Sequence, residues 1–295
     1  MFSYRLKNTV YLALLALLAL SGCERGAHSQ PAADSPATAI AAAVANPQRS
    51  QADRARDRYR HPQQTLEFFG IQPSMSVVEV WPGGGWYSDI LASFVTGQLV
   101  AAHFPATAAQ GSSERMVNYF QRSRASYIDK VAAPDSRWQA IELAEFDPAQ
   151  GLLTVPPASA DALLTFRNVH NWLNSDSEQT AFELFFQALR PGGVLGVVEH
   201  RAAPGISREL MRSSGYMTEA YVIELAEAAG FVLEAASEVN ANILDGRDHP
   251  KGVWTLPPNL RLGEERREEY LAIGESDRMT LRFRKPQQAT DESGY

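Results

Sequence analysis

The hydrophobic pattern of the chain changes its period sharply near residue 80. Residues 76–80 form a largely β-branched run with one carboxylate, Glu79, which is typical of a strand buried on both faces of a parallel sheet. Pro82 and three successive glycines then end this strand. Apolar residues next recur every fourth position, at Trp86, Ile90 and Phe94. The pattern therefore predicts a strand, a glycine turn and a helix that packs back on the sheet.

Further strands and helices are predicted in alternation along the chain. The expected strands are 98–103, 138–146, 161–166, 194–199, 231–239 and 277–285, and the expected helices are 113–131, 177–189 and 218–229. Within the strand 138–146, alternation predicts that Ile141 and Leu143 are buried. In the helix 113–131, the apolar stripe consists of Met116, Tyr119, Phe120 and Tyr127. Alternating strands and helices are typical of an α/β domain with a mostly parallel sheet.

The first residues have the pattern of an export signal. Arg5 and Lys7 precede an apolar run at 10–20 that is too short to span a bilayer. The sequence Leu-Ser-Gly-Cys at 20–23 resembles the bacterial lipobox, which implies cleavage before Cys23 and lipid attachment to it. Cys23 is the sole cysteine, so disulfides are excluded. The resemblance implies an envelope lipoprotein that faces the periplasm, and Glu24 favours the outer membrane; an ordinary secretory peptide is the alternative.

The domain organisation follows from composition. We expect a signal peptide at 1–22, a flexible tether at 23–37, N-terminal capping helices at 38–70, one α/β domain at 71–287 and a disordered tail at 288–295. The basic residues of 54–60 are predicted on a solvated helix face, and covering the carboxylate of a ligand is the alternative. The net charge of −7 becomes −9 once the signal peptide leaves with its two basic residues. This acidity argues against a nucleic-acid partner. The expected partner is a small-molecule substrate.

The glycine turn separates two classes of cofactor. A dinucleotide fingerprint requires Gly-x-Gly-x-x-Gly/Ala, which Gly83, Gly85 and Ser88 meet only in its first part. The stretch more closely resembles the first motif of class I S-adenosylmethionine-dependent methyltransferases, although Trp81 replaces the first glycine of that family. The resemblance implies that S-adenosylmethionine is the cofactor and that it contacts Glu79, Pro82, Gly83, Gly84 and Gly85. A turn that only closes a β-α unit is the alternative.

The resemblance covers residues 50–287. The sequence Leu-Arg-Pro-Gly-Gly at 189–193 and the apolar strand that ends at Glu199 resemble the fifth-strand region of the same family. The implied fold is a Rossmann-like α/β fold with a seven-stranded, mostly parallel sheet, an antiparallel last strand at 277–285 and helices on both faces. Three motifs are similar to those of the predicted-methyltransferase lipoproteins of proteobacteria, namely Arg-His-Pro at 60–62, Trp-Pro-Gly-Gly-Gly-Trp at 81–86 and Arg-Asn-Val-His-Asn-Trp at 167–172.

Two more cofactor contacts are implied by position. His103 ends the second strand, where the family places an acid on the ribose hydroxyls; an imidazole pairs with one hydroxyl but offers no bidentate carboxylate. Asp147 ends the third strand, where the family acid contacts the adenine amine. Because Pro148 follows it, Asp147 as an ordinary turn initiator is the alternative.

The loop after the fourth strand is the candidate acceptor site. Arg167, Asn168, His170 and Asn171 follow the strand 161–166, and ligands of open α/β sheets bind at the carboxyl ends of such strands. His170 is the candidate general base for methyl transfer to an oxygen or nitrogen acceptor, and a structural histidine is the alternative.

Export conflicts with a cofactor that is made in the cytoplasm. The second hypothesis is therefore a catalytically decayed, envelope-anchored binding module on the same scaffold. A third hypothesis is a metal site formed by His103, His170 and His200, each at the end of a predicted strand, although their spacing is not a known ligand pattern and we expect no metal.

Overall fold

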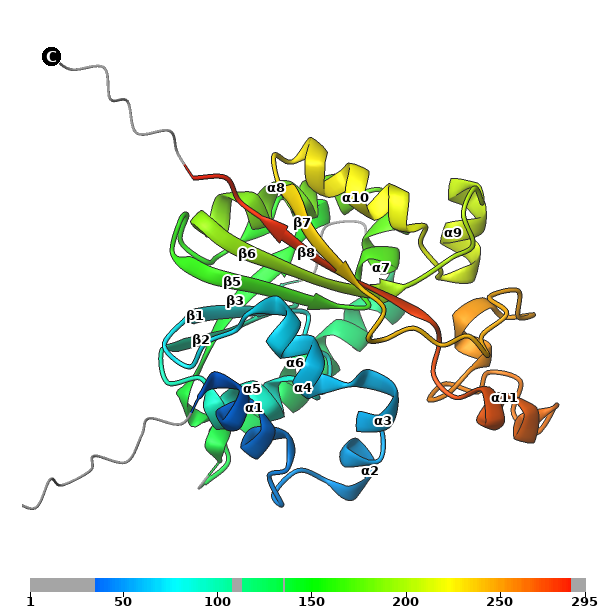
Figure 1. Ribbon diagram of the computed structural model, residues 1–295, viewed down its shortest axis with the longest axis horizontal. Coiled ribbons are helices and arrows are strands. Elements are labelled where there is room, and N and C mark those ends of the chain that lie inside the picture. The colour runs from blue at the N-terminus through cyan, green and yellow to red at the C-terminus, as the bar shows by residue number, and fades with distance from the viewer. Residues whose placement is uncertain (1–34, 108–112, 135, 288–295) are drawn as a thin grey trace, which may run out of the picture. The chain divides into compact units, whose positions relative to one another are not determined.

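The fold is built on an eight-stranded sheet with helices on both faces (Figure 1). The computed structural model describes residues 35–107, 113–134 and 136–287. All of them belong to one unit, Asp34–Tyr295. The predicted Cys23 anchor, the signal peptide and the tail 288–295 therefore lie outside the described residues. No helix in the described part of the chain is long and apolar enough to cross a membrane.

The strand order is β4-β3-β2-β1-β5-β6-β8-β7. The strands are β1 (Ser76–Val80), β2 (Gln98–His103), β3 (Ile141–Asp147), β4 (Leu152–Leu153), β5 (Ala160–Phe166), β6 (Leu189–His200), β7 (Val232–Ser237) and β8 (Arg278–Arg284). Strands β1, β2, β3, β5 and β6 pair in parallel, and β8 is antiparallel to both of its neighbours. The predicted sheet type is confirmed. The predicted number of strands was one too few, because the two residues of β4 are too short to show a period.

Helices cover the two faces of the sheet in separate groups. One face packs against α1 (Pro36–Val44), α4 (Pro62–Phe69), α5 (Ser88–Phe94) and α6 (Glu114–Ala132), and the other against α7 (Val169–Leu173), α8 (Glu178–Ala188), α9 (Arg208–Ser214) and α10 (Glu219–Ala228). Short helices α2 (Gln51–Arg54), α3 (Asp57–Arg60) and α11 (Arg267–Ile273) complete the described part of the chain. Figure 1 shows α3, α9 and α11 on the side toward which the parallel strands point.

Alternation along the strands divides the core into two hydrophobic clusters. In β1, Val77 faces the cluster under α1, α4 and α5, whereas Val78 and Val80 face the cluster under α7, α8 and α10. All three valines are buried, as predicted for a strand covered on both faces. Ile40 of α1 and Leu66 of α4 belong to the first of these clusters. The segment predicted as capping helices thus contributes side chains to the core of the domain.

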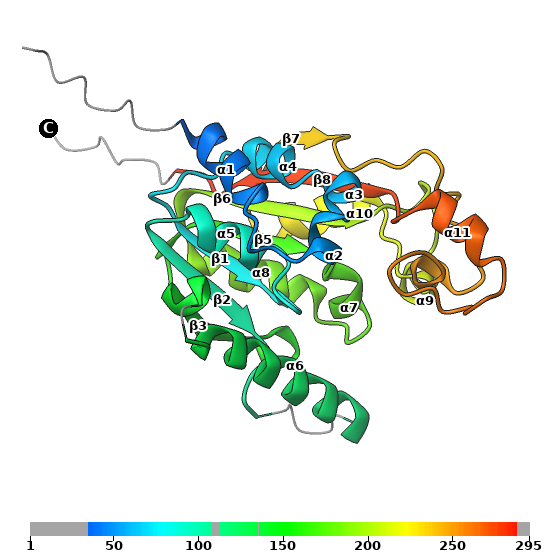
Figure 2. The same cartoon turned by 90° about the horizontal axis from the view of Figure 1, so that it is seen from below.

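Three local predictions are corrected by the structure. Leu143 is 39% exposed, because β3 lies near an edge of the sheet that the helices do not fully cover. Helix α1 begins at Pro36 with Ser35 as its cap, inside the segment predicted as tether. The stripe of α6 is divided, since Tyr127 is buried in the core while Met116 and Tyr119 remain exposed. Figure 2 shows α6 along the β3 side of the sheet, opposite α11.

Candidate functional site

A cavity of about 1630 Å³ opens at the carboxyl ends of the central strands. This volume exceeds that of a typical pocket for one drug-sized ligand, so the cavity has room for a cofactor and an acceptor together. Most predicted site residues line it, namely Glu79, Pro82, Gly83, Gly84, Gly85, Asp147, Arg167, Asn168, His170 and Asn171. The structure thus brings together two segments that are about ninety positions apart in the sequence.

Three residues of the turn after β1 have a left-handed backbone conformation. Gly83 and Gly85 have φ values of 58° and 82°, and Trp81 itself has φ 44°. Trp81 therefore adopts the backbone conformation for which glycine is suited, at a cost on the order of 1 kcal/mol. Its indole Nε1 donates a hydrogen bond of 3.0 Å to the Phe146 carbonyl, and its ring lies 4.7 Å from that of Phe104. The large side chain thus forms part of the wall of the cavity.

The three glycines have different surroundings. A Cβ atom at Gly83 or Gly84 would meet no heavy atom within 4 Å, so a ligand is free to approach the backbone there. A Cβ atom at Gly85 would lie 1.9 Å from the Trp138 ring. Glycine at position 85 therefore leaves the space that the Trp138 indole occupies. The predicted close approach of a ligand therefore applies to Gly83 and Gly84 and not to Gly85.

Glu79 lies at the floor of the cavity and is 3% exposed. Its Oε2 accepts a hydrogen bond of 2.6 Å from the Ser88 hydroxyl, which in turn lies 2.8 Å from the hydroxyl of Tyr127. Burial raises the pKa of Glu79 to about 7, against the lowering effect of Ser88. The carboxyl group is therefore poised between its neutral and charged forms near neutral pH.

His103 does not line the cavity. Its side chain is fully buried, its Nδ1 accepts a hydrogen bond of 2.8 Å from the Phe104 N–H, and its ring packs against Tyr127. Burial lowers the pKa of this imidazole to about 4, so it is neutral. The Nε2 atom of this ring is buried and has no hydrogen-bond partner among the described residues. The predicted contact with a ribose hydroxyl stays a prediction.

Asp147 has the structural role that was considered as its alternative. One carboxylate oxygen accepts from the Ala149 N–H at 3.0 Å and the other from the Gln150 side-chain amide at 2.7 Å. These bonds form the turn after β3, and the carboxylate still borders the cavity. Contact with an adenine amine stays a prediction.

Aromatic residues of α6 and of the segment after β2 line the same part of the cavity, namely Phe104, Tyr119 and Phe120.

The two asparagines of the loop after β5 differ in role. Asn168 is buried, and its amide donates to the Val80 carbonyl at 3.0 Å and to the Thr165 hydroxyl at 3.2 Å. It thereby ties the end of β5 to the end of β1. Asn171 is exposed at the cavity. Of the two, Asn171 is available to a ligand and Asn168 holds the strands together.

His170 is paired with a carboxylate that is more than two dozen positions away in the sequence. Its Nδ1 lies 3.0 Å from Oε1 of Glu199, which is fully buried and also accepts from the backbone N–H groups of His170 and His200. Because Glu199 is surrounded by donors, we assign the Nδ1 proton to His170. The Nε2 atom is then the free acceptor of the ring.

His170, Glu199 and His200 also bring metal-ligating atoms within 4.8 Å of one another. The predicted metal trio is corrected, because His103 is not part of this group. His200 Nδ1 lies 2.5 Å from the Ser276 hydroxyl. Burial, the neighbouring His170 and nearby guanidinium groups lower the pKa of His200 well below its usual value. The absence of a metal stays an expectation.

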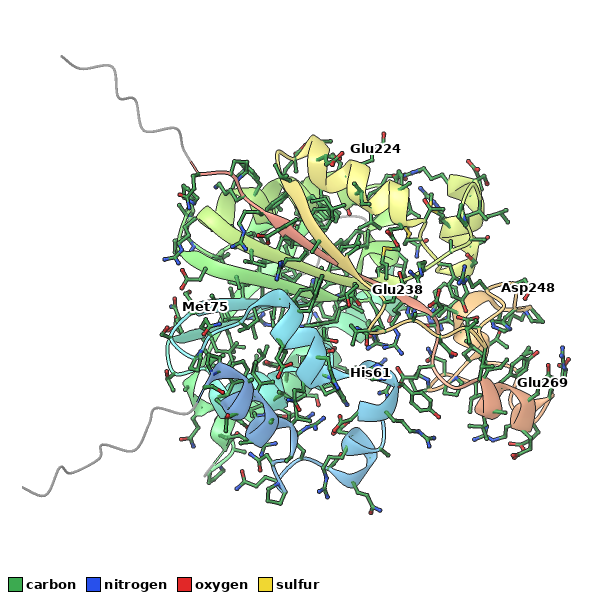
Figure 3. All side chains as sticks on the ribbon, in the orientation of Figure 1. His61, Met75, Glu224, Glu238, Asp248 and Glu269 are labelled. Carbon is green, nitrogen blue, oxygen red and sulfur yellow. The ribbon has the colours of Figure 1, made fainter. Side chains whose placement is uncertain are left out.

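Sequence reasoning missed the arginines that meet at this end of the cavity. Arg56 and Arg60 come from the N-terminal helices, and both bind Glu275, which directly precedes the last strand. Arg60 is 2% exposed, so its predicted place on a solvated face is wrong. His61, labelled in Figure 3 at the start of α4, ends α3 with φ 39° directly after Arg60. More than 200 positions separate these partners, and no local pattern predicts such a meeting.

The fold is that of class I methyltransferases. The phosphoethanolamine N-methyltransferase 2 of Haemonchus contortus, solved in complex with S-adenosyl-L-methionine, matches 78% of this chain and 53% of its own, with a TM-score of 0.51 and 16% identity. The cyclase SpnF matches 80% of this chain and 82% of its own, with a TM-score of 0.51 and 17% identity. No family model and no curated protein matches the sequence. These likenesses establish an α/β Rossmann-like methyltransferase fold.

Proposed function

We propose that this protein binds S-adenosylmethionine and transfers its methyl group to an oxygen or nitrogen atom of a small molecule. The observation that carries the proposal is a single cavity in which open backbone at Gly83 and Gly84 meets the His170–Glu199 pair. A structural neighbour that binds this cofactor supports the choice of ligand. The cavity fits the cofactor, since a glycine cradle and an aromatic wall are both present.

In this proposal, residues of the chain bind the cofactor, orient the acceptor and accept one proton. Glu79, Gly83 and Gly84 would hold the cofactor, which supplies an electrophilic methyl group when bound. His170 Nε2 accepts the proton of the acceptor hydroxyl or amine, and Glu199 fixes the ring and stabilises the imidazolium that forms. Positioning of the cofactor and the acceptor together in one cavity contributes the remaining rate enhancement.

The cellular setting of the proposal rests on the sequence. A Leu-Ser-Gly-Cys lipobox and three shared motifs support an envelope lipoprotein of the proteobacterial group, attached to the outer membrane through Cys23. The competing proposal is a binding module that has lost catalysis. It is favoured by Trp81, whose side chain stands where the family has glycine, and by His103, which is absent from the cavity lining.

An assay of S-adenosylhomocysteine release from the full chain, with a panel of hydroxyl- and amine-bearing acceptors, tests the proposal. We expect His170→Gln to lower the rate by about 10²-fold or more, because a general base contributes at least this much. Glu224→Gln on the outer surface of α10 serves as the control and should leave the rate unchanged. Cofactor binding without release for any acceptor would favour the binding module.

A further inference from the structure

One end of the cavity contains more positive than negative charge. Four arginines, Arg56, Arg60, Arg167 and Arg278, lie around the single carboxylate of Glu275, and we call these four residues the arginine cluster. Glu275 accepts from Arg56 Nε at 2.6 Å, from Arg60 Nε at 3.1 Å and from Arg278 Nη2 at 3.1 Å. Glu199, the other carboxylate nearby, is already engaged by His170. Three of the four positive charges are therefore left without a carboxylate of their own.

Several guanidinium donors of the cluster lack an acceptor. The Nη2 atoms of Arg56 and Arg60 are buried and have no hydrogen-bond partner among the described residues. The backbone N–H of Arg167 donates to the Val198 carbonyl, but its guanidinium, which lines the cavity, forms no hydrogen bond or ion pair within the described ranges. Arg278, by contrast, donates from Nε to the Ser276 carbonyl and from Nη2 to the Tyr59 carbonyl and to Glu275. A buried donor without an acceptor is costly, so the cluster is incomplete without a ligand.

The electrostatics agree with this geometry. Burial and the neighbouring arginines lower the pKa of Arg60 to about 9 and that of Arg167 to about 10. Burial would raise the pKa of Glu275, but the surrounding arginines, Arg60 first, lower it to about 2. Both arginines remain charged at neutral pH. Burial of these charges costs free energy, and a bound anion would offset that cost.

We propose that the arginine cluster binds an anionic group of the methyl acceptor, either a carboxylate or a phosphoryl group. Planar guanidinium groups match both oxyanions with paired donors. Arg167 lies three positions before His170, so an acceptor held by its anionic group would bring a nearby hydroxyl or amine to the proposed base. The inference rests on the proposed function, because it names the substrate class of that site.

The cluster extends from the proposed base to the glycine turn. Arg167 follows β5, which pairs with β1, and Arg60 Cζ lies 4.6 Å from the ring of Trp86, the residue after the glycine turn. We assign the anion to the acceptor because Arg167 belongs to the same loop as the proposed base, His170. The carboxylate of the cofactor is the other source of such an anion, and the experiment must separate the two.

The experiment is a calorimetric titration of the full chain with inorganic phosphate and, separately, with S-adenosylmethionine, at constant ionic strength. We expect phosphate to bind the parent and to bind Arg167→Gln and Arg56→Gln about tenfold more weakly, the loss typical of one charged hydrogen bond. The control Arg58→Gln changes an exposed arginine of the same short helix as Arg60 and should bind phosphate as the parent does. The affinity for S-adenosylmethionine should stay within twofold in all variants.

Thermal melting shows whether the variants fold. Arg167→Gln removes an unbalanced charge, so its melting temperature should equal or exceed that of the parent without phosphate, and phosphate should raise it less. Absence of phosphate binding to the parent overturns the proposal even if the cofactor binds. Weaker cofactor binding by Arg167→Gln with unchanged phosphate binding also overturns it. Phosphate binding without cofactor binding would leave the anion site standing and refute the proposed methyl transfer.

Discussion

Trp81 and Arg167 have left-handed backbones at the ends of two adjacent strands, β1 and β5. Neither is a glycine, so each conformation is strained and must be held by its surroundings. Trp81 is fixed by its bond to the Phe146 carbonyl, and the backbone of Arg167 by its bond to the Val198 carbonyl. Strain of this kind collects at functional sites, and here both residues line the same cavity.

Glu79 gives the first prediction at the scale of a residue. Its folded pKa of about 7 lies above its usual value of 4.5, so the folded state binds this proton more tightly than the unfolded state. The stabilisation is fully present below pH 4.5 and is lost as the pH rises through 7. Glu79→Gln, which stays neutral, should therefore be more stable than the parent at pH 8, by about 3 kcal/mol.

Urea unfolding of both proteins at pH 5 and pH 8 measures this difference. Glu224→Gln is the matched control, because Glu224 projects from the outer side of α10 (Figure 3). Its stability should follow the parent at both pH values. An equal pH dependence in Glu79→Gln and the parent would show that Glu79 has an ordinary pKa.

The glycine turn gives a second prediction, in which two neighbouring positions respond differently. Gly85→Ala should destabilise the fold by about 3 kcal/mol, because the added methyl group overlaps the Trp138 ring and the residue has a positive φ. Gly83→Val should cost less stability, since its Cβ meets open space, but should abolish cofactor binding. Thermal melting and calorimetry separate the two effects. A loss of stability in Gly83→Val with no loss in Gly85→Ala would contradict the roles assigned to these two glycines.

At the scale of the element, the loop after β5 has two roles. One of its asparagines holds two strands together, and the other is available to a ligand. Asn168→Ala should lower stability by about 1–3 kcal/mol, because the Val80 carbonyl loses its buried donor. Asn171→Ala, three positions later and exposed, should leave the urea midpoint unchanged. The same unfolding midpoint in both variants would mean that Asn168 does not hold β1 and β5 together.

Strong local patterns predicted the elements well, and weak patterns did not. The predicted bounds of β1 and β2 agree with the structure, because both strands are mainly apolar and β1 ends at the proline and glycines that follow it. The two residues of β4 and the five of α7 are too short for a period to show. Leu143 alternates as a buried residue should, but burial depends on which helices reach the edge of the sheet, and the sequence does not state this.

At the scale of the molecule, the site was only partly predictable. The glycine turn and the Arg167–Asn171 loop were found, because each follows an apolar strand and parallel strands align their carboxyl ends. The pairing of His170 with Glu199 and of Arg60 with Glu275 was not found, since both depend on the packing of distant segments. The burial of His103 was not predicted either, because a position in a motif does not specify whether the side chain reaches the cavity.

The proposed membrane anchor gives a prediction for the whole protein. Cys23→Ala should release the protein from the membrane fraction and abolish labelling by a fatty-acid analogue, because Cys23 is the sole cysteine. Cell fractionation and the labelling assay measure both effects. Labelling that persists in the variant would place the lipid elsewhere or exclude it.

Binding of S-adenosylmethionine is the central claim, and calorimetric titration of the full chain tests it most directly. We predict weak binding of one cofactor per chain and a rise in melting temperature that follows its concentration relative to the dissociation constant. His103→Asp should not strengthen this binding, because residue 103 is fully buried and is not among the residues that line the cavity. If millimolar cofactor gives neither heat nor a thermal shift, the protein does not use S-adenosylmethionine and the proposed methyl transfer is wrong.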